Sequence, residues 1–96
     1  MKKVLVINPK DNVAVALTEI KAGEKISIEV GGKQIEITAR SDIPFGHKLA
    51  IKKILKGDEV VKYGEVIGKA TADIEVGEHV HVHNVKSLVG SPHARR

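Results

Sequence analysis

The sequence contains no cysteine and no tryptophan, and Phe45 and Tyr63 are its only aromatic residues. The absence of cysteine excludes a disulfide framework, a thiolate nucleophile and any metal site built on sulfur ligands. With so few aromatic side chains, the core must consist of valine, isoleucine, leucine and alanine, a composition that favours strands. A metal bound by this chain would be held through nitrogen and oxygen ligands.

Long apolar runs are also missing. The apolar residues near the start of the chain end at Asn8-Pro9, too early for a signal segment or a membrane span. We therefore expect a cytoplasmic protein with no membrane partner. The net charge of +4 comes from 16 basic and 12 acidic residues spread along the chain. Without a long basic run or interleaved aromatic residues, nucleic-acid binding is not expected.

The length of 96 residues predicts one small domain over 1–96, with an ordered core at about 2–88 and a basic tail at 89–96. A domain of this size has little volume in which to enclose a deep catalytic pocket. We therefore expect a partner, which could be a larger subunit or further copies of the same chain.

Glycine punctuates the chain and predicts short strands rather than helices. An apolar-x-x-Gly-[Asp/Glu]-x-[Ile/Val] motif occurs four times, around Gly23, Gly57, Gly64 and Gly77. Glycine accepts the positive φ of a tight turn, and a β-branched residue then starts the next strand. The pattern predicts a strongly bent all-β domain with at most a helical turn near residues 42–45. Further strands are expected at Val4–Ile7, Val13–Leu17, Leu49–Ile54 and Val66–Ala70.

One hairpin can be predicted down to its register. Apolar and polar residues alternate on both sides of Gly31-Gly32, which form a two-residue loop. This loop places Ile28 opposite Ile35 and Ile26 opposite Ile37. All four isoleucines then lie on one face of the hairpin.

The most informative segment is Gly-Glu-His-Val-His-Val-His-Asn at residues 77–84. In an extended strand, His79, His81 and His83 would share one face, while Val80 and Val82 would point into the core. Imidazoles on one strand face lie close enough to approach one divalent metal ion or one anionic substrate. The alternative is an edge strand whose solvated face happens to be histidine.

A second polar cluster lies at Gly46-His47-Lys48. It offers an imidazole and a cation beside a glycine that allows close approach of the backbone, an arrangement that suits a carboxylate or a phosphate. The alternative is an exposed loop. If both clusters serve one site, His47 must lie near the histidine segment.

The order of several motifs along the chain resembles the SAF-type amino-terminal domain of the altronate and galactarate dehydratase family. These motifs are residues 11–17, 43–50, 62–71, 73–74 and 77–84. The resemblance implies a small β-clip fold. It also implies a lyase that removes water from a sugar acid with the help of a divalent metal ion, iron or manganese. Fused members continue into a catalytic domain, whereas this chain ends at Arg96, so the resemblance is closest to a separate small subunit. Such a subunit would need a large catalytic subunit and would be inactive alone.

Carried over to this sequence, the resemblance implies that six residues line one side of the active site. We assign catalytic roles to His47, Lys48 and His81, substrate contacts to His79 and Asn84, and metal ligation to His81 and His83. The division of roles among the histidines stays open at the level of sequence. Two other functions also stay open, namely a non-catalytic SAF-type binding module and the small subunit of a related lyase such as sulfolactate sulfo-lyase.

Overall fold

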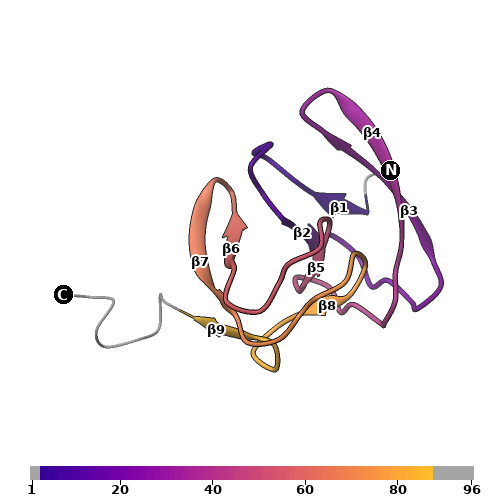
Figure 1. The fold of residues 1–96 in the computed structure, drawn as a ribbon. Helices are drawn as coiled ribbons and strands as arrows, with labels where there is room; N and C mark the ends of the chain where they lie inside the picture. The colour runs from indigo at the N-terminus through magenta and orange to yellow at the C-terminus, as the bar shows by residue number, and fades with distance from the viewer. Residues whose placement is uncertain (1–2, 88–96) are drawn as a thin grey trace.

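The computed structural model describes residues 3–87 and is built entirely from short strands and turns (Figure 1). The described strands are β1 (Val4–Leu5), β2 (Val13–Ala16), β3 (Lys25–Val30), β4 (Lys33–Thr38), β5 (Lys48–Ala50), β6 (Glu59–Lys62), β7 (Glu65–Ala70), β8 (His79–Val80) and β9 (Val85–Ser87). No helix occurs among these residues, and hence none that could cross a membrane. The all-β prediction is confirmed. The basic tail predicted at 89–96 lies outside the described residues.

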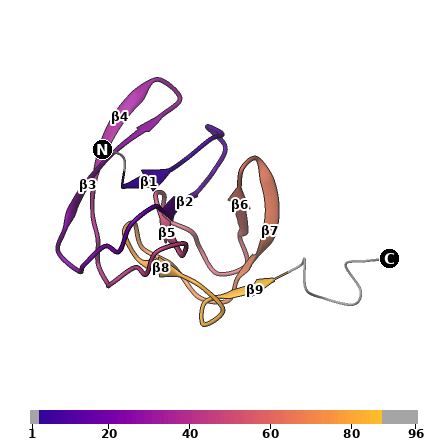
Figure 2. The ribbon, with the colours of Figure 1, turned by 180° about the vertical axis from the view of Figure 1, so that it is seen from behind.

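The strands form three antiparallel sheets. A central sheet has the order β1-β2-β5-β8, the hairpin β3-β4 forms a second sheet, and β6-β7-β9 form a third. The two long hairpins lie on opposite sides of the central sheet in both views (Figures 1 and 2). The strands expected at Val4–Ile7 and Leu49–Ile54 are shorter than predicted: β1 ends at Leu5, and β5 ends at Ala50, where the chain bends.

The predicted β3-β4 hairpin is confirmed residue by residue. Ile28 pairs with Ile35 and Ile26 pairs with Ile37, with Gly31 and Gly32 in the loop. Three of the four isoleucines are buried, whereas Ile35 is 36% exposed. Val30, next to the loop, still packs against the core.

A repeated turn connects the strands. Each copy begins with a fully or almost fully buried isoleucine and reaches a glycine of positive φ three residues later; the isoleucines are Ile20, Ile43, Ile54 and Ile74. The copies pair through isolated bridges, Ile20 with Ile43 and Ile54 with Ile74. Within a pair, the glycine N–H of one copy donates to an alanine carbonyl that precedes the other, as Gly46 does to Ala16 at 2.8 Å. The chain thus consists of two similar halves, each carrying one long hairpin.

The sequence motif also predicts a copy of this turn at Gly64, and this prediction is wrong. Tyr63 and Gly64 instead form the loop of the β6-β7 hairpin, with φ values of 55° and 79°. Two successive positive φ values are typical of a type I′ hairpin turn. The true fourth copy lies at Gly46. The sequence motif did not detect it, because His47 occupies the position of the acid and Leu49 the position of the final isoleucine or valine.

The two faces of the central sheet cover two separate cores. Ala14 and Leu49 contribute to the core under the β3-β4 hairpin, while their neighbours Val13 and Ala50 contribute to the core under the β6-β7 hairpin. This division follows from the alternation of side chains along β2 and β5. Both cores are aliphatic, as the composition predicts.

Candidate functional site

The histidine segment does not form the predicted continuous strand. Strand β8 ends at Val80, and the chain turns through residues 81–84. Val80 is fully buried, but Val82 is 81% exposed, so the two valines do not share a core-facing side. The prediction of a single histidine face is therefore wrong beyond Val80.

Asn84 holds this turn in place. Its amide oxygen accepts the backbone N–H of His81 at 2.9 Å, and its amide nitrogen donates to the carbonyl of His79 at 2.8 Å. The Asn84 residue is only 4% exposed. We expected Asn84 to contact substrate. In this structure its amide forms hydrogen bonds with the backbone of His79 and His81. It positions the two histidines.

His47 reaches the cluster from the repeated turn at Gly46. In the other three copies, an acidic side chain accepts the backbone N–H of the residue after the isoleucine; these pairs are Glu24 with Lys21, Asp58 with Leu55 and Glu78 with Glu75, at 2.9–3.1 Å. In the fourth copy Pro44 has no N–H to donate, and His47 stands in place of the acid. The imidazole is thereby released from the turn.

Three imidazoles converge at this point. The Nδ1 atom of His47 lies 2.9 Å from the Nε2 atom of His79, so one nitrogen donates and the other accepts. The ring of His81 stacks on that of His47 with a centroid distance of 4.3 Å. One ligand nitrogen from each of the three residues lies within 4.8 Å of the others. The prediction that His47 lies beside the histidine segment, 32 residues away, is confirmed.

His83 has a more peripheral position. Its ring is tilted by 39° against that of His79, at a centroid distance of 5.3 Å, and the residue is exposed. His81, for which we also expected metal ligation, belongs to the convergent group of three, whereas His83 does not. The structure thus offers His47 and His79 as the neighbours of His81 in a ligand set.

The surroundings of His79 and His81 favour the neutral form of these two imidazoles. Burial lowers the pKa of His79 below its ordinary value, and the nearby rings of His47 and His83 lower it further. The pKa of His81 is lowered in the same way, by burial and then by His47 and Lys48. Burial also lowers the pKa of Lys48, with a further contribution from the charge of Lys62. Neutral imidazole is the form that binds metal ions and accepts protons.

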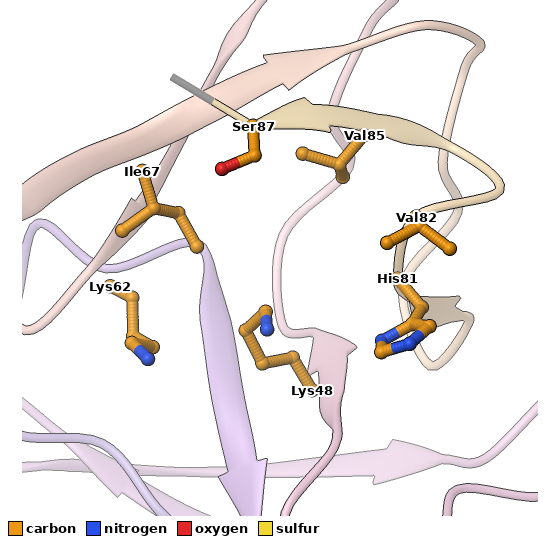
Figure 3. A pocket seen from close by; sticks show the side chains of 7 residues that line it. All are labelled: Lys48, Lys62, Ile67, His81, Val82, Val85 and Ser87. Carbon is orange, nitrogen blue, oxygen red and sulfur yellow. The ribbon is translucent and has the colours of Figure 1, made fainter. Parts of the chain in front are cut away.

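A hollow of about 320 Å³ opens beside the cluster, with His81 as a shared wall (Figure 3). It is lined by Lys48, Lys62, Ile67, His81, Val82, Val85 and Ser87. Sequence reasoning did not select Lys62, which β6 brings to the hollow from the second half of the chain. The available signal was its place at the start of one of the motifs that carry the family resemblance.

Fold and site together define a small all-β module that presents imidazoles and cations at one open surface. The family model for the altronate/galactarate dehydratase SAF domain matches residues 2–88. The chain belongs to this family.

Relatives of two kinds share this sequence. Altronate dehydratase of Bacillus subtilis (strain 168) is 45% identical over 87 residues, which are 91% of this chain and 17% of that protein. The (2R)-sulfolactate sulfo-lyase subunit alpha of Paracoccus pantotrophus is 57% identical over 51 residues, covering 53% of this chain and 76% of the relative. The protein of the same name from Chromohalobacter salexigens is 38% identical over 80 residues, covering 80% and 85%. The chain therefore spans about a sixth of the altronate dehydratase and most of the sulfo-lyase subunits.

Proposed function

We propose that this chain is the small subunit of a sugar-acid dehydratase and contributes His47, Lys48, His79 and His81 to an active site completed by a large catalytic subunit. The observation that carries the proposal is the convergence of three imidazoles beside a lysine at an open, partly buried surface. The names of the altronate dehydratase relatives supply the reaction class. The size of the domain supports a shared site, since so small a chain cannot enclose a sugar acid.

The residues suit an elimination from a 2,3-dihydroxy acid. A base removes the proton on the carbon next to the carboxylate, and hydroxide leaves from the following carbon and takes up a proton to become water. An imidazole can accept the first proton and donate the second, because histidine titrates near neutrality. The ammonium of Lys48 would stabilise the negative charge that develops on the substrate carboxylate.

The three histidines also suit a divalent metal ion, iron or manganese. His47, His79 and His81 would hold the ion, since one ligand nitrogen from each of them lies within 4.8 Å of the others. When bound, the ion would polarise substrate oxygens and stabilise the enediolate charge. Three ligands leave coordination positions for substrate or for groups of the large subunit.

A second function is favoured by a specific observation. The match to the sulfo-lyase subunit of Chromohalobacter salexigens covers 80% of this chain and 85% of that protein. A small subunit of a sulfolactate sulfo-lyase would use the same proton abstraction but release sulfite instead of hydroxide. The histidine cluster counts against a non-catalytic binding module, which would need no such arrangement.

The test combines the purified chain with a large subunit of the altronate dehydratase type, in the presence of iron(II) or manganese(II). Altronate, galactarate and sulfolactate are offered separately, and the 2-keto-3-deoxy acid and sulfite are measured. We expect turnover of a sugar acid only when both subunits are present. Sulfite release would select the sulfo-lyase. Full turnover by the small chain alone, or no turnover of any substrate by the pair, would refute a shared active site.

A further inference from the structure

The hollow beside the histidine cluster carries two cations that converge from different halves of the fold. Lys48 reaches it from the central strand β5, and Lys62 reaches it from the end of β6 (Figure 3). His81 lines the hollow and also belongs to the histidine cluster. Apolar side chains from β7 and from the segment around β9 form the opposite wall.

We infer that this hollow binds an acidic group of the ligand, a carboxylate or a sulfonate, through Lys48 and Lys62. The inference rests on the proposed function. It adds a location for the acid group of the ligand and assigns to Lys62 the selection of that group. The chain would thus hold an anion subsite of its own, before any large subunit is added.

Neither lysine has an acidic partner within residues 3–87. The ion pairs there join Lys3 to Glu24, Lys21 to Glu19 and Lys53 to Glu75. Lys62 lies 5.2 Å from the centroid of the Tyr63 ring, a contact that leaves its N–H donors free for an anion. Two like charges that face one hollow repel each other. An anion placed between them would turn this repulsion into two attractions.

The backbone around Lys62 is fixed by the loop that precedes strand β2. Asn12 donates its backbone N–H to the carbonyl of Val61 at 3.2 Å, and its side-chain oxygen accepts the N–H of Val61 at 2.8 Å. The buried carboxylate of Asp11 accepts the N–H of Gly64 at 2.7 Å. Lys62 lies between these two anchored positions. The structure therefore fixes the backbone from which the Lys62 side chain reaches the hollow.

The size and position of the hollow also suit a substrate group. A volume of about 320 Å³ is at the lower end of small-molecule sites. His81 lines the hollow together with Lys48 and also belongs to the group of three histidines, so a carboxylate held by the lysines would bring the adjoining hydroxyl-bearing carbons to the imidazoles. An acid group in the hollow would thus orient the ligand toward the cluster.

The test is a titration of the ¹⁵N-labelled 96-residue chain with L-tartrate, a 2,3-dihydroxy diacid, followed by NMR. We expect the amide signals of Lys62, Ile67 and Val85 to shift on binding. Erythritol has the same carbon skeleton without carboxylates and should leave these signals in place. Racemic 3-sulfolactate distinguishes the two acid groups, because tighter binding than tartrate would identify the sulfonate as the preferred one.

Three variants make the result specific. Lys62→Gln should weaken tartrate binding about tenfold, the loss expected for one charged hydrogen bond, whereas Lys62→Arg keeps the charge and should retain most of it. Lys33→Gln removes an exposed charge at the far hairpin and should have no effect. Equal binding by Lys62→Gln, an equal loss in Lys33→Gln, or equal shifts with erythritol would overturn the inference. Because no turnover is measured, a failure of the proposed dehydratase activity would leave this result standing.

Discussion

At the scale of single residues, the site depends on one exchange within a repeated turn. Three turns use an acid to accept a backbone N–H, and the fourth has lost both the acceptor and the donor, at His47 and Pro44. The two changes belong together, since an acid at position 47 would find no N–H to accept. His47 thereby becomes available to His79 and His81.

Substitution of single histidines should show that the three convergent histidines contribute more to metal binding than His83 does. His47→Gln, His79→Gln and His81→Gln should each weaken manganese(II) binding by about tenfold or more, because each removes one nitrogen ligand. His83→Gln is the matched control and should change the affinity little, since its ring lies outside the group. Isothermal titration calorimetry measures all four. A large effect confined to His81→Gln and His83→Gln would instead support the ligand pair expected from sequence.

Proton binding should destabilise the metal-free chain. The pKa values of His79 and His81 are lowered in the folded state, so the unfolded chain binds more protons in mildly acidic solution. Stability is therefore fully present above the ordinary histidine value of about 6.5 and is lost as the pH falls below it. The melting temperature should decrease between about pH 7.5 and about pH 5.5. The double variant His79→Gln/His81→Gln should show a smaller decrease, and an unchanged slope would contradict the assignment.

Asn84 is expected to be essential for the turn. Asn84→Ala leaves the N–H of His81 and the carbonyl of His79 without their partners, which should reduce the free energy of unfolding by about 1–3 kcal/mol. Gln34→Ala removes an exposed amide from the far hairpin and should have little effect. Urea denaturation of both variants tests this. Equal stability of the two variants would show that water replaces the Asn84 amide without loss.

At the scale of elements, local patterns predicted one hairpin fully and the histidine segment poorly. The β3-β4 register follows from a period of two on both strands and a two-residue glycine loop, all visible in the sequence. Beyond Val80, the side chain of Asn84 offers the backbone hydrogen bonds that compete with a strand. The position of Lys62 depends on contacts between distant segments, which no local pattern contains.

The link between the proline and the histidine can be measured as a coupling energy. In the background of Pro44→Ala, the turn regains an N–H, and His47→Glu should then form the bond present in the other three copies. We expect this double variant to be more stable than the sum of its single changes by about 0.5–1.5 kcal/mol. A double-mutant cycle in urea provides the value. Additive effects would show that the turn does not use the restored bond.

At the scale of the whole molecule, two cores share one sheet and should unfold together. Leu49 belongs to one core and Val60 to the other, and β5 contributes to both. Leu49→Ala and Val60→Ala should each remove about 1–5 kcal/mol of stability. Each change should shift the unfolding of both hairpins equally, as followed by NMR signals of Ile28 and Ile67. Separate transitions would show two independent folding units.

The pairing of the four turns has a consequence for protein engineering. The backbone needs the glycine and the buried isoleucine of every copy, but the copy at Gly46 retains the shared backbone pairing without the acid. The turns that contain Glu24 and Asp58 are therefore two further positions at which a proline and a histidine could be introduced together. The fold can be regarded as a scaffold with four equivalent turns, of which the one at Gly46 carries a histidine in place of the acid.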